Sequence, residues 1–161
     1  MSAEVPRYFV KPGYIFVTDK PYLLHTVLGS CVSVCLRDKK TQIASMNHIV
    51  FDKPYNNQRD ARFASISIPY MIRLMKNRGS RLEDVTAHIV GGAYNSSFGN
   101  LSVSENNIST TEKILNKFKL EIQTRDVGGE MGRKVIFNTE TGEILIYKVN
   151  NVRKDDWYDY H

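Results

Sequence analysis

The chain has 161 residues, 42% of them hydrophobic, which predicts a single globular domain whose core needs no disulfide or structural metal for stability. Its formal net charge of +5 is small and the basic residues are dispersed, which argues against a nucleic-acid binder. No run of about 20 apolar residues predicts membrane insertion, so we expect a soluble cytoplasmic protein that is a monomer by default.

The first third of the chain is rich in β-branched and aromatic residues, in short segments separated by turns. It predicts strands at Tyr14–Thr18, Leu23–Val27, Val32–Leu36 and Ile43–Phe51. The polar stretch Asp52–Arg59 contains a proline and two asparagines, which predicts a surface loop directly after the last of these strands.

Helical patterns occupy the middle of the chain. Apolar residues at spacings of three and four predict an amphipathic helix over Ala61–Arg78. A short apolar strand, Ala87–Val90, and a polar turn, Asn95–Asn100, follow it. A second helix comes next: Ser109–Glu112 has the form of a capping box, although the helix could also begin nearer Ser104.

The last third predicts strands at Leu120–Val127, Lys134–Asn138 and Glu143–Val149. Thr139–Gly142 supplies a hairpin turn between the last two of them. Two helices are too few to connect all these strands in parallel, so the order of elements predicts an α+β layered domain over residues 1–149. The polar and aromatic tail, residues 150–161, is compatible both with docking on a partner and with disorder.

Cys31 follows Leu28-Gly29-Ser30, so we expect it where a glycine-containing turn enters a strand. Gly29 allows a tight bend, which can expose the thiol and direct backbone N–H groups of the turn at a bound carbonyl oxygen. The alternative is a buried cysteine that acts as a small apolar residue. Cys35 lies inside the predicted strand and is expected to be structural. Two cysteines at this spacing predict free thiols and no typical zinc site. We expect no cofactor.

His48 is the histidine that the predicted topology brings near Cys31. The two residues lie at similar distances along the chain from a turn near Lys39 and Lys40, so we expect them nearly opposite each other in an antiparallel hairpin. Such a pair can exist as thiolate and imidazolium, which would lower the pKa of the thiol towards neutrality. A hydrogen-bonded core histidine is the alternative.

A Cys/His pair is suited to acyl transfer. The thiolate attacks a carboxamide or ester carbon, and the imidazole protonates the leaving group and then activates water. A third polar group should orient the imidazole. Thr26, Asn47 and Asp52 are the local candidates.

The segment Thr26-Val27-Leu28-Gly29-Ser30-Cys31-Val32, followed by Asn47-His48, resembles the chemoreceptor glutamine deamidase family, CheD. Further segments resemble later motifs of that family in the same order: Gly91-Gly92-Ala93, Asp126-Val127-Gly128-Gly129, Gly132-Arg133-Lys134 with Phe137, and Thr141-Gly142-Glu143. The resemblance covers residues 13–149. It implies a layered sandwich of two mixed β-sheets with helices outside.

The resemblance also implies roles and partners. Cys31 would be the nucleophile, His48 its base and Thr26 the third residue of the site. The substrate would be glutamine side chains on the cytoplasmic helices of methyl-accepting chemotaxis receptors, converted to glutamate with release of ammonia. Some members of the family also hydrolyse receptor methyl esters, and a CheC-type phosphatase is the implied regulatory partner.

The remaining site candidates are Gly29, Ser30, Asn47, Gly92 and Arg133, for binding substrate or its oxyanion. Glycines of the later motifs are expected to let the chain approach the active-site strand closely. The side chain of Arg133 is expected either to anchor the neighbouring loop or to meet an acidic receptor surface. Two other functions stay open: a non-catalytic chemotaxis adaptor that binds receptor or phosphatase, and a nucleic-acid binder.

Overall fold

The structure is a computed structural model that describes residues 4–96 and 100–150. Its strands are β1 (Arg7–Phe9), β2 (Ile15–Thr18), β3 (Leu23–Leu28), β4 (Val32–Asp38), β5 (Ala44–Asn47), β6 (Val85–Gly91), β7 (Glu121–Val127), β8 (Gly132–Asn138) and β9 (Ile144–Val149). Its helices are α1 (Ala64–Asn77), α2 (Leu101–Lys117) and the 3-10 turn Leu82–Asp84. The predicted tail falls almost entirely outside the described residues.

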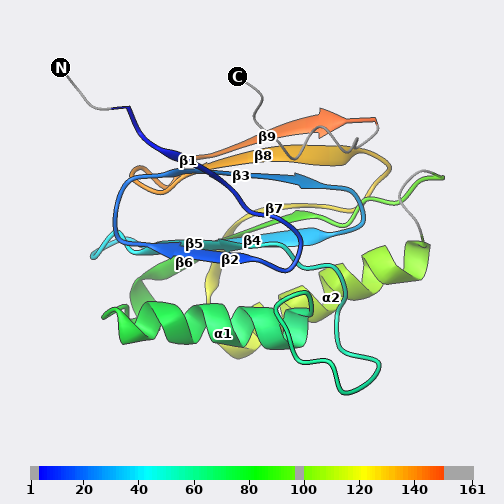
Figure 1. Cartoon of the computed structure of the whole chain (residues 1–161), viewed down its shortest axis with the longest axis horizontal. Coiled ribbons are helices and arrows are strands. Elements are labelled where there is room, and N and C mark those ends of the chain that lie inside the picture. Colours follow the sequence, from blue (N-terminus) through cyan, green and yellow to red (C-terminus); the bar gives the residue numbers. More distant parts are fainter. Residues whose placement is uncertain (1–3, 97–99, 151–161) are drawn as a thin grey trace.

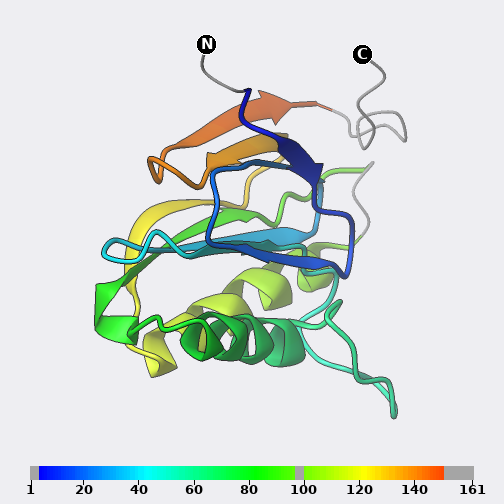
Figure 2. The same ribbon diagram turned by 60° about the vertical axis from the view of Figure 1, so that its left-hand side comes forward.

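The elements stack in layers (Figure 1). We call the sheet with strand order β1-β3-β8-β9 the outer sheet, and the sheet with order β2-β5-β4-β6-β7 the central sheet. Both long helices cover one face of the central sheet, and the outer sheet covers the other (Figure 2). Each sheet is mixed, because β1 pairs with β3, and β6 with β7, in parallel. The predicted α+β sandwich of two mixed sheets with flanking helices is confirmed.

Side chains of the central sheet alternate between two cores, as the pleat of a strand requires. Val34 and Leu36 of β4 face the helices, where they join the buried core that includes Met75 of α1. Cys35, between them in sequence, faces the outer sheet and packs with Met46 and other residues of the inter-sheet core. Complete burial of each large apolar side chain stabilises the fold by about 1.5–3 kcal/mol.

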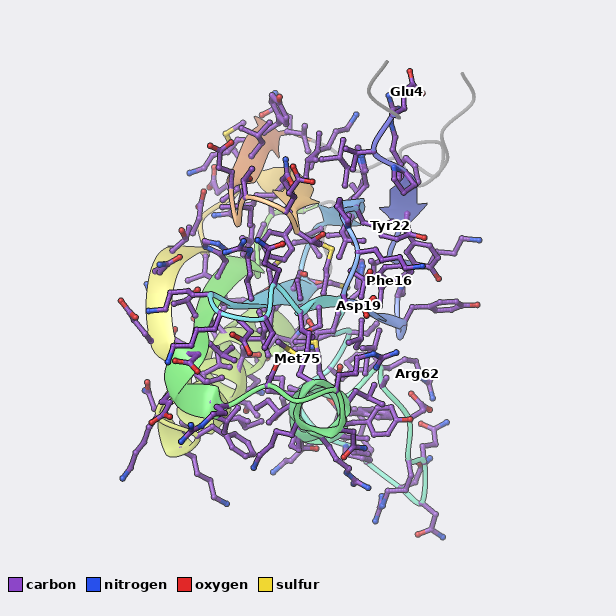
Figure 3. The ribbon with its side chains drawn as sticks, turned by 90° about the vertical axis from the view of Figure 1, so that its left-hand side faces the viewer. Glu4, Phe16, Asp19, Tyr22, Arg62 and Met75 are labelled. Atoms are coloured by element: carbon purple, nitrogen blue, oxygen red, sulfur yellow. The ribbon has the colours of Figure 1, made fainter. Side chains whose placement is uncertain are left out.

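Aromatic residues close one edge of the inter-sheet core. The rings of Phe16 in β2 and Tyr22 lie 4.8 Å apart, and Figure 3 shows them together at this edge. Tyr8 of β1 stacks on Phe16 at 4.2 Å. These contacts tie the first strand of the outer sheet to the edge strand of the central sheet.

The predicted strand Ile43–Phe51 is shorter in the structure. β5 ends at Asn47, and Ile49 and Phe51 form only isolated bridges. Backbone hydrogen bonds explain the difference, because the N–H groups of Val50 and Phe51 both donate to the carbonyl of Arg62. After Ile49 the chain therefore stops pairing with β4 and bonds instead to the segment before α1.

Helix α2 begins at Leu101, earlier than either predicted start. Asn100 is the N-cap, and its Oδ1 accepts a hydrogen bond of 2.8 Å from the N–H of Ser102. The capping-box interpretation of Ser109 was wrong, because this residue lies inside the helix. No helix within residues 4–96 and 100–150 is long and apolar enough to cross a membrane.

Candidate active site

Cys31 lies where the chain passes from the outer sheet to the central sheet. The turn Gly29–Cys31 joins β3 of the first to β4 of the second. Cys31 is partly exposed, its thiol is free, and it packs against the inter-sheet core. The predicted position at the entry of a strand is therefore correct. Cys35, four residues further along in β4, is fully buried.

Backbone hydrogen bonds from the neighbouring strand hold this turn. The N–H of Gly92 donates to the carbonyl of Cys31 at 2.8 Å, and the N–H of Ala93 donates to that of Gly29 at 2.9 Å. Gly91 has a φ of +117°, and a Cβ atom there would overlap the carbonyl oxygen of Cys31. Only glycine allows β6 to approach the turn this closely.

His48 is diagonal to Cys31, not opposite to it. Val32 bridges Ile49, so the antiparallel register places His48 opposite Ser33 and Cys31 opposite Val50. Residues two positions apart share a face, so Cys31 and His48 both point into the inter-sheet layer. In regular antiparallel strands such diagonal neighbours lie roughly 7–8 Å apart, within reach of an imidazole.

The offset has a simple cause in the hairpin turn. Asp38 Oδ1 accepts hydrogen bonds from the N–H groups of Lys40 and Thr41, and the N–H of Asp38 donates to the carbonyl of Ile43. The turn is therefore centred one residue later than the sequence predicted. A shift of one residue in the centre moves a cross-strand partner by two positions and leaves it on the same face.

Thr26 of β3 holds the imidazole of His48 from the outer sheet. Its Oγ1 lies 2.8 Å from His48 Nδ1 and donates to the carbonyl of Val10 at 2.8 Å. A hydroxyl has one proton, and it is given to Val10, so His48 Nδ1 must be the donor to Thr26. This tautomer leaves the basic lone pair of the neutral ring on Nε2.

Of the other two candidates for orienting His48, Asn47 points to the opposite face. Its Oδ1 accepts from the N–H of Val34 at 2.7 Å, and its Nδ2 donates to Ser67 Oγ of α1 at 3.0 Å. Asn47 therefore ties the central sheet to a helix and does not join the Cys31 face. Asp52 lies further along, where its carbonyl accepts from the N–H of Ser65.

Burial favours the neutral form of both reacting groups. It raises the pKa of the Cys31 thiol to about 12 and lowers the pKa of the His48 imidazole to about 4, with a hydrogen bond to the Val10 carbonyl opposing the second shift. Burial in the free protein opposes the expected thiolate–imidazolium pair. A proton must leave Cys31 as the sulfur attacks.

The Gly29–Cys31 turn presents backbone donors. No hydrogen-bond acceptor for the N–H of Ser30 or of Cys31 is found among the described residues. A trans peptide points its carbonyl and the following N–H in opposite directions. Because the Gly29 carbonyl is bonded to Ala93, the N–H of Ser30 points away from that strand. These groups can donate to a substrate oxygen.

Arg133 is 2% exposed and anchors the loop that precedes β8. Its Nη1 donates to the carbonyls of Gly128 and Met131, and its Nη2 bonds Asp126 at 2.9 Å. The first of the two expected roles is the one observed, and the guanidinium does not present itself to a receptor surface. Gly128 has a φ of +81° and open space around the position of a Cβ atom. This glycine is therefore needed for the backbone conformation of the turn, and not to let another segment approach closely.

Gly92 lies between the Cys31 turn and α2. It has a φ of +71°, and a Cβ atom there would clash with the side chain of Ile108. Gly92 therefore lets α2 pack against the turn. Its N–H is already bonded to Cys31, so it borders the candidate site through its backbone.

Contacts from α2 were missed by sequence reasoning. Asn107 Nδ2 donates to the carbonyls of Ser30 and Val50, and Ser104 Oγ donates to the carbonyl of Ala93. The available signal was the set of polar residues at helical spacing, Ser104, Asn107 and Thr111, on the buried face of α2. In residues 4–96 and 100–150, no group of three or more His, Cys, Asp or Glu side chains could hold a metal ion.

Comparisons with known proteins agree with the resemblance seen in the sequence motifs. A family model described as "CheD chemotactic sensory transduction" matches residues 51–148. A probable chemoreceptor glutamine deamidase CheD of Sulfurimonas denitrificans is 33% identical over 148 residues, 89% of this chain and 94% of that protein. The chemoreceptor glutamine deamidase CheD of Thermotoga maritima is 30% identical over 139 residues, 85% of this chain and 88% of that protein. A probable CheD 1 of Anaeromyxobacter dehalogenans is 31% identical over 136 residues, 83% and 80% of the two chains.

Proposed function

This chain belongs to the CheD family, and from that premise we propose that it is a cysteine-dependent protein-glutamine deamidase that acts on chemoreceptors. The observation that carries the proposal is the gathering of Cys31, His48 and Thr26 on facing surfaces of the two sheets, with Thr26 bonded to His48 at 2.8 Å. The names of its relatives supply the substrate class.

The proposed first step forms a thioester. Cys31 Sγ attacks the side-chain carbonyl carbon of a receptor glutamine while His48 Nε2 accepts the thiol proton. The imidazolium then gives this proton to the leaving nitrogen, and ammonia departs as the C–N bond breaks. Thr26 and the Val10 carbonyl keep the ring in the tautomer that this step needs.

Hydrolysis completes the proposed cycle. His48 removes a proton from a water molecule as its oxygen attacks the thioester, the C–S bond breaks, and Cys31 recovers its proton. The net reaction consumes one glutamine amide and one water and yields glutamate and ammonia. A glutamyl methyl ester would follow the same path with methanol as the leaving group, which makes ester hydrolysis a proposed second activity.

We assign the oxyanion donors to the backbone N–H groups of Ser30 and Cys31. Each tetrahedral intermediate carries a negative oxygen, and N–H groups already aimed at its position stabilise it without reorganisation. Both groups lie in or directly after the bend at Gly29 and Ser30. Cys31 and His48 would become charged only with substrate bound, when these N–H groups stabilise the developing oxyanion.

The proposed partners are methyl-accepting chemotaxis receptors, as substrates, and a CheC-type phosphatase, as regulator. Because the substrate side chain would lie on a cytoplasmic receptor helix, the enzyme would act in the cytoplasm. The Cys31 turn must then be accessible to that helix, and a monomer would leave it so. The alternative function is a chemotaxis adaptor that binds receptor without turnover.

The test uses the purified protein and the cytoplasmic fragment of a cognate receptor. Ammonia release is followed, and converted glutamines are mapped by peptide mass spectrometry. We expect conversion by wild type and by the control Cys35→Ala, none by Cys31→Ala, and strong loss in His48→Gln. Thr26→Val should lose activity and Thr26→Ser should keep it.

Two results would change the proposal. Receptor conversion by Cys31→Ala at the wild-type rate would remove Cys31 from the mechanism. Intact receptor binding with no conversion by wild type would favour the adaptor.

A further inference from the structure

Asn107 links both sides of the Cys31 turn through a single amide group. Its side chain is fully buried in α2, and Nδ2 donates to the carbonyl of Ser30 at 3.1 Å and to that of Val50 at 2.9 Å. Ser30 directly precedes Cys31, and the register places Val50 opposite Cys31. One NH₂ group therefore joins the turn that carries the thiol to the segment that follows β5.

The orientation of this amide follows from its neighbours. Both atoms that it faces are carbonyl oxygens, which can only accept, so the NH₂ group must point at them. Its Oδ1 is buried and has no hydrogen-bond partner among the described residues. An amide oxygen left in this state opposes folding. Packing alone would favour an apolar side chain at this position, so the two hydrogen bonds are what the amide contributes.

These bonds fix the direction of the peptide group between Ser30 and Cys31. The carbonyl of Ser30 is held towards α2, so the N–H of Cys31 points away from the helix. The same helix face fixes the adjoining segment, because Ser104 Oγ donates to the carbonyl of Ala93 at 2.8 Å and the N–H of Ala93 donates to Gly29.

We infer that Asn107 is a positioning residue of the deamidase: it holds the Ser30–Cys31 peptide so that the N–H of Cys31 faces the oxyanion. This inference rests on the proposed function. Asn107 does not touch the substrate and acts only through the turn. Its loss should weaken stabilisation of the transition state while the receptor surface that binds substrate is unchanged.

The test compares Asn107→Ala with the matched control Thr111→Ala. Thr111 is also fully buried on α2, and its hydroxyl has no hydrogen-bond partner among the described residues. Loss of one oxyanion donor typically lowers kcat by about 10²–10³-fold, and a donor that is only misaligned should lose less. We expect kcat of Asn107→Ala to fall about 10- to 100-fold with KM within about twofold of wild type, and kcat of Thr111→Ala to stay within about twofold.

A kcat of Asn107→Ala within about twofold of wild type would overturn the inference. An equal loss in Thr111→Ala would also overturn it, because general loosening of α2 would then explain both. Should Asn107→Ala fail to fold at the assay temperature, Asn107→Ser leaves a smaller cavity, cannot span both carbonyls and takes its place with the same expectation.

A second readout does not depend on turnover. The backbone amide signals of Ser30 and Cys31 in ¹⁵N NMR spectra should shift and broaden in Asn107→Ala and stay in place in Thr111→Ala. Unchanged signals would overturn the positioning role. If wild type releases no ammonia, the proposed function fails, and these signals still decide whether Asn107 holds the turn.

Discussion

The Cys31 thiol should react slowly with alkylating agents at neutral pH. Burial raises its pKa from about 9 to about 12. Each unit is a factor of ten in the thiolate population at pH 7, so Cys31 should carry roughly 1000-fold less thiolate than an ordinary cysteine. In energy this is about 4 kcal/mol, at about 1.4 kcal/mol per unit.

The measurement is the rate of iodoacetamide alkylation of Cys35→Ala, in which Cys31 is the remaining thiol. The logarithm of the rate should rise with pH at a slope of about one between pH 6 and 10, without a plateau. The urea-unfolded protein provides the reference rate. A plateau with an apparent pKa below about 8 that disappears in His48→Gln would refute this reasoning, because it would show the ion pair in the free protein.

Two further predictions concern stability, measured by urea unfolding. Gly91→Ala should destabilise the fold by several kcal/mol, because it combines a strained φ, which alone costs roughly 1–3 kcal/mol, with overlap on the Cys31 carbonyl. The control Gly79→Ala, with a φ of +106° and open space, should lose only the stability that the strained φ costs. Equal losses of stability in the two variants would contradict the argument. Because the pKa of His48 is about 4 when folded and near 6.5 when unfolded, the unfolded chain binds the extra proton between these values, so stability should fall by up to about 3 kcal/mol from pH 7 to pH 4. His48→Gln should show a flatter profile, and an identical profile would contradict the assignment.

Local patterns predicted most of the fold. Strands of alternating or continuous apolar residues and one amphipathic helix follow directly from side-chain periodicity, and the observed β3, β4 and α1 lie close to their predicted ranges. The short strand β1 was missed because Arg7–Phe9 carries no periodicity of its own and is a strand only through its pairing with β3.

Within the site, the sequence predicted that Cys31 and His48 lie on adjacent segments, but not their exact register. Cys31 and His48 share a face as expected, and the diagonal offset came from the Asp38 turn, whose centre depends on side-chain hydrogen bonds that periodicity does not report. The pKa shifts of Cys31 and His48 were missed because they depend on burial, which the sequence pattern does not report. Asn107 was missed because it reaches the turn from a distant helix.

The crossing of the chain from one sheet to the other at Gly29–Cys31 has a consequence for biosynthesis. Thr26, Cys31 and His48 leave the ribosome close together, but Thr26 is opposite Val135 in the outer sheet, and β6 must also be present to brace the turn. A nascent chain that ends before β8 therefore carries every reacting group without an assembled site. Competence to react should arise late, when the C-terminal hairpin closes the outer sheet.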